Sequence, residues 1–293
     1  MAQKTYGKLE HKIISLFSIG TKFNWNNEDY TVVLSDKPQA KGGEPKTDVY
    51  IIASKNTDSE QYIELKISCK LLGTNEFQEN KIKAERAKQI WGENWSNILT
   101  ATFEEISDKF NNTEVYFPLG SGRTKETQFT NGWKVEIASK ARELSRPLNL
   151  SNQEIRDYIY KGTSLDDSKK NALVDGKIIT NSGVAEYMLV TTPESINSTS
   201  DVLEKIILID DYEIVPHYII FTANNFRVLE NKSDGNRPLG VQVLWSADLV
   251  NNKMTHSIEF SHPLDPNYSG KAISERTMDE INKLGSAFKK DFI

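Results

Sequence analysis

The sequence has few of the residues on which several common kinds of site depend. Cys69 is the only cysteine among 293 residues, which excludes an intrachain disulfide and a zinc site built from several thiolates. The four histidines, His11, His217, His256 and His262, do not show the spacing of zinc ligands. No Gly-x-Ser-x-Gly, P-loop or Gly-x-Gly-x-x-Gly pattern occurs, so the usual serine hydrolase, NTPase and dinucleotide-binding interpretations have no support.

Long hydrophobic runs are also missing. The longest early apolar run, around residues 13–19, is far too short to span a bilayer, and the N-terminus lacks a signal-peptide pattern. With the single cysteine, this predicts a soluble cytoplasmic protein without a membrane partner. The net charge is -5, from 36 basic and 41 acidic residues. This balance argues against a general polyanion-coating protein but allows a local basic cleft.

The pattern of apolar residues predicts a mixed α/β protein. Residues 47–53 and 61–68 read as two strands joined by a polar turn, which is typical of an antiparallel hairpin. The Ser-x-x-Glu pattern at residues 151–154 is a capping box and predicts a helix over about residues 152–160. The pattern of residues 134–144 does not distinguish helix from strand. Further helices are expected at 7–17, 77–91, 95–110 and 274–288, and further strands at 30–34, 115–117, 212–223 and within 228–259.

Two acids and a lysine lie on the predicted hairpin. Strand side chains alternate between faces, so Glu64 and Lys66 project the same way, roughly 7 Å apart. Asp48 opens the partner strand. Phosphodiester hydrolysis needs such a set, because carboxylates hold Mg²⁺ and a lysine can stabilise the transition state or orient the attacking water. Taken alone, Glu-x-Lys on a strand is more often a solvated surface, and an Asp at a strand start is more often a turn residue.

This hairpin resembles a known family. Asp followed at hairpin distance by Glu-x-Lys is the signature of the PD-(D/E)xK nuclease superfamily, and residues 42–48 (Gly-Gly-Glu-Pro-Lys-Thr-Asp) look like the corresponding loop of MspI-like type II restriction endonucleases. The proline stands three positions before Asp48 and not next to it, and Glu64 stands where MspI-like enzymes can carry an amide. Weaker similarity extends to Gly7-Lys8-Leu9 and to the segment from Arg237 to Phe260.

The resemblance implies a restriction-endonuclease-like core, with a central mixed sheet flanked by helices. It implies Mg²⁺ as cofactor, Asp48 and Glu64 as metal ligands and Lys66 as the catalytic lysine, so that Lys66→Ala abolishes cleavage. Glu10, in the predicted first helix, is either a dipole-compensating acid or an auxiliary metal ligand. We expect residues 1–120 to form the catalytic part and residues 121–293 a DNA-recognition part, within one continuous globular unit.

The expected partner is double-stranded DNA. The resemblance also implies a prokaryotic host with a companion DNA methyltransferase, and it allows a homodimer. A structure-specific repair or recombination nuclease and a non-catalytic DNA-binding module remain alternatives. Discrete fragments from long duplex DNA would exclude the repair nuclease, and any metal-dependent nicking would exclude the non-catalytic module. Basic loops supply the candidates for contact with phosphates or, through Arg, with guanine. These are Lys41, Lys46, Arg123, Lys125, Lys232 and Arg237.

Overall fold

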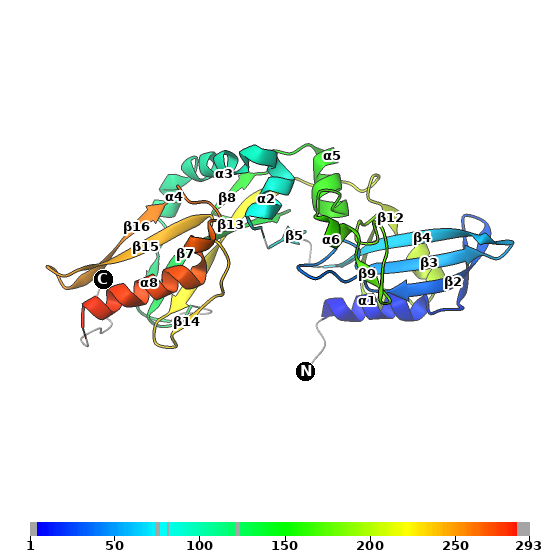
Figure 1. Cartoon of the computed structure of the whole chain (residues 1–293), viewed down its shortest axis with the longest axis horizontal. Coiled ribbons are helices and arrows are strands. Elements are labelled where there is room, and N and C mark those ends of the chain that lie inside the picture. Colours follow the sequence, from blue (N-terminus) through cyan, green and yellow to red (C-terminus); the bar gives the residue numbers. More distant parts are fainter. Residues whose placement is uncertain (1–4, 74–76, 81, 121–123, 286–293) are drawn as a thin grey trace. The chain divides into compact units, whose positions relative to one another are not determined.

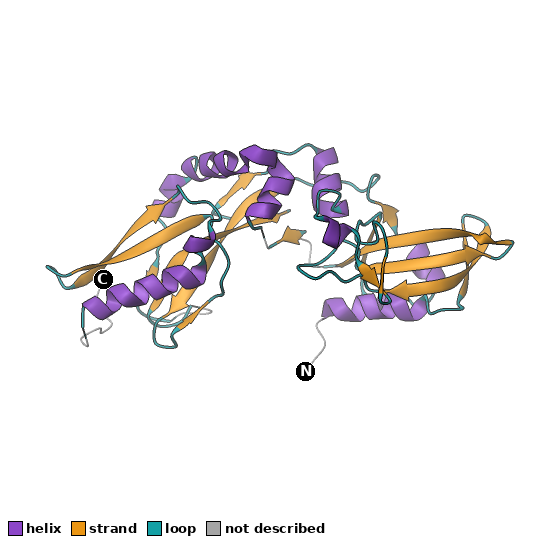
Figure 2. Ribbon diagram, in the orientation of Figure 1, coloured by secondary structure: helices purple, strands orange, loops and turns teal. Residues whose placement is uncertain are grey.

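The chain folds as a mixed α/β protein with one mixed sheet and one larger antiparallel sheet (Figures 1 and 2). The expected α/β class is therefore confirmed. Among the helices in the described part of the chain, none is both long enough and apolar enough to cross a bilayer. The computed structural model describes residues 5–73, 77–80, 82–120 and 124–285.

Two compact units make up the chain, and each consists of two separate segments. The first unit contains Met1–Asn75 and Asn149–Val215, and the second contains Glu76–Leu148 and Pro216–Ile293. The boundary that we expected near residue 120 falls inside the second unit. The hairpin with the predicted catalytic residues lies in the first unit.

The first unit is built on a six-stranded sheet with the order β1-β2-β3-β4-β11-β12. Neighbouring strands are antiparallel except β4 and β11, which are parallel, so this sheet is mixed, as expected. The first segment contributes α1 (Thr5–Leu16), β1 (Lys22–Trp25), β2 (Glu28–Asp36), β3 (Val49–Lys55) and β4 (Asp58–Leu71). The second contributes α5 (Asn152–Glu154), η2 (Ile155–Lys161), α6 (Asp167–Lys170), β9 (Leu173–Val174), β10 (Lys177–Ile178), β11 (Tyr187–Thr191), η3 (Pro193–Ser195), α7 (Thr199–Leu203) and β12 (Ile207–Leu208).

One face of this sheet packs on α1. Leu9, Ile13 and Phe17 recur every four residues and are buried in one core with Leu65 and Ile67 of β4. Each such side chain contributes about 1.5–3 kcal/mol when it is fully buried. The predicted alternation along β4 is confirmed, and its even-numbered residues project from the opposite face of the strand. Figure 1 shows α1 running along the sheet beside β2 and β3.

The capping box predicted at residues 151–154 is confirmed. Ser151 Oγ accepts a hydrogen bond from the Glu154 backbone N–H, and the Glu154 carboxylate accepts one from the Ser151 N–H. The helix that follows widens into a π-helix, η2, and ends at Gly162 in the left-handed conformation. Single π-turns often mark functional segments, and η2 leads directly to the residues that hold the loop before Asp48.

The second unit is an antiparallel half-barrel with the strand order β14-β13-β7-β15-β16, to which β5, β6 and β8 add pairs at β7 and β13. Helix α8 packs on β15, β13, β7 and β14. Residues 134–144, where the sequence pattern did not distinguish helix from strand, contain the end of strand β7. The helix expected from residue 77 begins only at Ala84, because residues 78–79 pair with β7. The elements are β5 (Gln78–Glu79), α2 (Ala84–Trp91), η1 (Gly92–Asn94), α3 (Trp95–Glu104), α4 (Ser107–Asn111), β6 (Tyr116–Phe117), β7 (Gln128–Ala138), β8 (Ser145–Pro147), β13 (Tyr218–Arg227), β14 (Lys232–Ser233), β15 (Val241–Asp248), β16 (Lys253–Glu259), η4 (Pro266–Tyr268) and α8 (Gly270–Lys283).

A buried polar network anchors α8 to this sheet. The fully buried Asn131 of β7 donates from Nδ2 to Asn224 Oδ1 of β13 (2.9 Å) and to Ser274 Oγ of α8 (3.0 Å). Gly270, the first residue of α8, lies so close to Asn224 that a Cβ there would come within 2.3 Å of Oδ1. The network therefore fixes where the helix meets the sheet.

Candidate active site

The predicted catalytic residues lie on one hairpin, but its register separates them. Val49 pairs with Ile67 and Ile52 pairs with Glu64, so Asp48, directly before β3, faces the level of Ser68. Glu64 lies four residues from that level along β4, roughly 13 Å away at the rise of a strand. Asp48 and Glu64 are therefore too far apart to share one metal ion.

Asp48 instead sits at the centre of another group, which we call the Asp48 cluster: Glu10, Lys37, Asp48, Ser68 and Lys70. Asp48 Oδ2 accepts hydrogen bonds from the Cys69 backbone N–H (2.7 Å) and from Ser68 Oγ (3.3 Å). Burial raises the pKa of the Asp48 carboxyl, as does the charge of Glu10, whereas the charges of Lys70 and Lys37 and the Cys69 N–H lower it. The net direction is upward. Burial thus outweighs the two lysine charges and disfavours the ionised form of Asp48.

Helix α1 supplies the second carboxylate of this cluster. The Glu10 side chain is 14% exposed, and its Oε2 lies 2.5 Å from Nζ of Lys37, the residue that follows β2. The charge of Glu10 also acts on Asp48, so the prediction that Glu10 is an auxiliary metal ligand stays open. Sequence reasoning did not select Lys37, which is one of three lysines in the loop expected after the strand at residues 30–34.

Lys66 belongs to a separate cluster with Glu64 and Glu186. Its Nζ lies 2.7 Å from Glu186 Oε1 and 3.6 Å from Glu64 Oε2, and its side chain is 9% exposed. The Glu186 N–H also donates to the Lys66 carbonyl, so the pair links β4 to the start of β11. Tyr50 pairs with Lys66 across the hairpin, and burial and the charge of Glu64 raise the pKa of its hydroxyl. These contacts join Lys66 to two carboxylates and link β4 to the start of β11.

The loop before Asp48 is held by residues from the second segment of the same unit. The backbone N–H groups of Lys46 and Thr47 donate to the Gly183 carbonyl (2.9 and 3.3 Å). A Cβ at Gly162 would lie 2.5 Å from Lys46 Cγ, so the absence of a side chain at 162 leaves room for Lys46. Of the two lysines expected to contact DNA from this loop, Lys41 is exposed and Lys46 is half-buried.

The other predicted DNA contacts lie in the second unit. Arg123 falls outside the described residues. Lys125 and Lys232 are exposed. Arg237 is half-buried, and its guanidinium donates to the Asn80 carbonyl. The structure thus leaves Lys125 and Lys232 accessible, while one donor of Arg237 is used within the protein.

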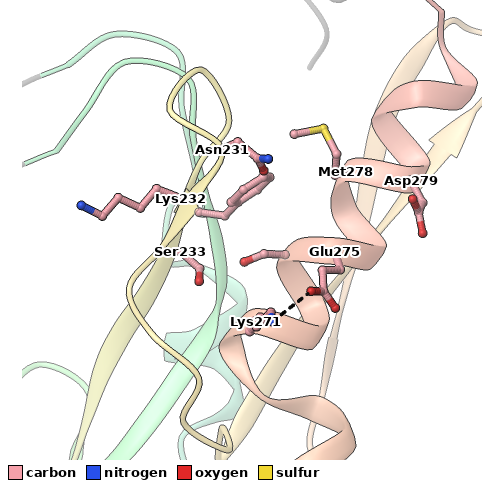
Figure 3. A pocket seen from close by; sticks show the side chains of 9 residues that line it. Asn231, Lys232, Ser233, Lys271, Glu275, Met278 and Asp279 are labelled. Carbon is pink, nitrogen blue, oxygen red and sulfur yellow. Dashed lines mark ion pairs between the residues drawn. The ribbon is translucent and has the colours of Figure 1, made fainter.

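Lys232 borders an open cavity of about 520 Å³ between β14 and α8 (Figure 3). Its side chain points away from α8. Across the cavity, Lys271 forms an ion pair with Glu275 (3.6 Å). Because acids and lysines balance, the lining shows no preference for a polyanion. The cavity is lined by Phe226, Asn231, Lys232, Ser233, Lys271, Ser274, Glu275, Met278 and Asp279.

The Asp48 cluster fits a hard divalent cation better than the predicted set does. In the described part of the chain, no three or more His, Cys, Asp or Glu side chains are grouped as metal ligands. Mg²⁺ does not need three, because it often binds one or two carboxylates and otherwise keeps water and phosphate oxygens. Glu10 and Asp48 would supply two hard oxygen ligands, and a nearby cation favours the ionised form of a carboxyl whose pKa burial has raised. The hydrogen bonds from Ser68 Oγ and from the Cys69 backbone N–H both go to Oδ2 of Asp48, so a metal ion could bind at Oδ1.

Comparison of the chain with protein-family models, with curated proteins and with solved structures gave no match. The functional interpretation therefore rests on the residues and geometry described above.

Proposed function

We propose that this protein is a Mg²⁺-dependent endonuclease that hydrolyses phosphodiester bonds of double-stranded DNA at a short specific sequence, as type II restriction endonucleases do. The observation that carries the proposal is the position of Asp48. Its carboxylate is held by the end of β4 and interacts with the charges of Glu10 and Lys70. The resemblance of residues 42–48 to a restriction-endonuclease loop supports the same conclusion.

The proposed catalytic roles differ from those that the sequence suggested, because Glu10 replaces Glu64 as a metal ligand and Lys70 replaces Lys66 as the catalytic lysine. Asp48 and Glu10 would hold the metal, which supplies charge neutralisation and a more acidic bound water. Lys70 would take the role that the sequence suggested for Lys66, because its charge acts on Asp48. A lysine at this position stabilises negative charge that develops on the phosphate or orients the attacking water. Ser68 would hold the Asp48 carboxylate in place.

Recognition of DNA would use basic groups outside this cluster. Lys41 and Lys46 precede Asp48 in its loop and would contact phosphates near the cut bond. Lys125, Lys232 and Arg237 would contact DNA from the second unit. A restriction function also implies a companion methyltransferase in a prokaryotic cytoplasm, and it allows a homodimer on a symmetric DNA site.

Two lysine variants test the site assignment directly. Lys70→Ala should reduce Mg²⁺-dependent cleavage of a sequenced plasmid on the order of 10²–10³-fold, the usual effect of losing one preorganised group that stabilises the transition state. Lys66→Met keeps the aliphatic stem of the buried lysine and should retain cleavage within about tenfold, because it removes the ion pairs with Glu186 and Glu64 and leaves the proposed metal ligands in place. Circular dichroism and thermal unfolding would check that both variants fold.

The outcomes separate the hypotheses. Discrete fragments from the wild-type protein support a restriction enzyme, whereas cleavage confined to branched or damaged DNA supports a repair nuclease. Loss of cleavage in Lys66→Met with retention in Lys70→Ala would place the site at the Lys66 cluster. Undiminished cleavage in both variants would exclude both assignments, and no metal-dependent nicking by the wild-type protein would refute the proposal.

A further inference from the structure

The ion pair between Lys37 and Glu10 involves one of the two carboxylates proposed as metal ligands. Lys37 Nζ is 2.5 Å from Glu10 Oε2, and the Lys37 backbone N–H donates to Asp36 Oδ1 (2.7 Å), which fixes the base of the side chain. The Lys37 side chain is 44% exposed, against 14% for Glu10. The ammonium can therefore leave toward solvent, while the carboxylate stays in place.

Lys37 also acts on the rest of the cluster. Burial lowers the pKa of its ammonium, but the hydrogen bond and charge of Glu10, with the charges of Asp48 and Glu44, outweigh burial and raise that pKa. In the opposite direction, the charge of Lys37 lowers the pKa of Asp48. The ammonium is thus the counter-ion of the two carboxylates proposed as metal ligands. A metal ion that coordinates Glu10 Oε2 competes with the ammonium for that oxygen.

We propose that Lys37 is a resident counter-ion of the metal site, which pairs with Glu10 in the metal-free protein and competes with a divalent metal ion for this carboxylate. The inference rests on the proposed function, because it takes these two carboxylates as the metal ligands. It has two consequences. Metal binding is weaker than two carboxylates alone would allow, and the displaced ammonium is released beside the place where a DNA phosphate would bind the metal.

The size of the effect follows from Coulomb's law. An ammonium about 5 Å from a divalent ion is repelled, even at the dielectric constant of water, by an amount equivalent to roughly a tenfold change in binding constant. Partial burial increases this value, while movement of Lys37 into solvent decreases it. Removal of the charge should therefore tighten metal binding by about tenfold.

Titration with Mn²⁺ in the absence of DNA, followed by isothermal calorimetry, tests the inference. Lys37→Gln should bind Mn²⁺ about tenfold more tightly than the wild-type protein, and Lys37→Arg, which keeps the charge, should bind like the wild type. Lys8→Gln is the matched control, because Lys8 is an exposed lysine on α1. It stands two residues before Glu10, and side chains two residues apart on a helix do not face each other. This control should change the affinity less than twofold. Asp48→Asn should abolish the binding event.

Equal or weaker Mn²⁺ binding by Lys37→Gln would overturn the inference, as would an equal gain in Lys8→Gln. Absence of Mn²⁺ binding in both the wild-type protein and Lys37→Gln would overturn it as well. The assay does not depend on cleavage. A wild-type protein that leaves DNA uncut but shows the expected difference in Mn²⁺ affinity would refute the nuclease while supporting the role of Lys37.

Discussion

Gly183 provides a direct test of how the loop before Asp48 is held. A Cβ at this buried position would lie 1.9 Å from the Lys169 carbonyl oxygen and 3.0 Å from Pro45 Cβ. Since such contacts are not shorter than 3.0 Å, the backbone of Gly183→Ala would have to shift by about 1 Å. The Gly183 carbonyl accepts the N–H groups of Lys46 and Thr47, so the same shift disturbs both hydrogen bonds.

The magnitude is the sum of two effects. Overpacking against a backbone atom costs about 1–3 kcal/mol, and each weakened hydrogen bond costs about 0.5–1.5 kcal/mol. We therefore expect Gly183→Ala to destabilise the first unit by about 2–6 kcal/mol. Gly42→Ala is the control, because a Cβ at Gly42 meets nothing within 4 Å and the residue does not have a positive φ. The control should change stability by less than about 0.5 kcal/mol.

Urea unfolding would measure this loss, and hydrogen exchange would assign it. Because the chain has two units, a single unfolding transition cannot be assumed. Exchange of the Lys46 and Thr47 amides should accelerate in Gly183→Ala and stay unchanged in Gly42→Ala. A loss of less than about 1 kcal/mol, with both amides still protected, would refute the proposed close packing.

Two further predictions concern polar side chains at single positions. Asp48→Asn should raise the melting temperature in chelator at mildly alkaline pH. Burial raises the folded-state pKa of Asp48, so the folded protein binds this proton more tightly than the unfolded chain and its stability falls as pH rises. The gain should shrink as the pH falls through the raised pKa, and a gain independent of pH would contradict the assignment. Asn131→Ala should destabilise the second unit by about 2–3 kcal/mol, because Asn224 and Ser274 each lose a hydrogen-bond donor. Urea unfolding with less than about 0.5 kcal/mol change would contradict this role.

The sequence alone determined the local elements around the site. Alternation from Ile63 to Ile67 predicted β4, and the four-residue spacing of Leu9 and Ile13 predicted α1, because these patterns depend only on the geometry of a strand and a helix. The capping box at residues 151–154 was visible for the same reason. The sequence also selected Asp48, and it raised Glu10 as one of two alternatives.

Tertiary structure decided which residues accompany Asp48. A symmetric hairpin turning at residue 57 would place Lys66 opposite Asp48. The register instead shifts at a bulge beside Ser54 and Lys55, and Ser68 takes that place. Bulges of this kind arise from the twist and packing of the whole sheet, which a local pattern does not encode. Lys37 and Glu10 join the cluster because α1 packs on the sheet and β2 ends beside it, and only the folded unit brings these distant residues together.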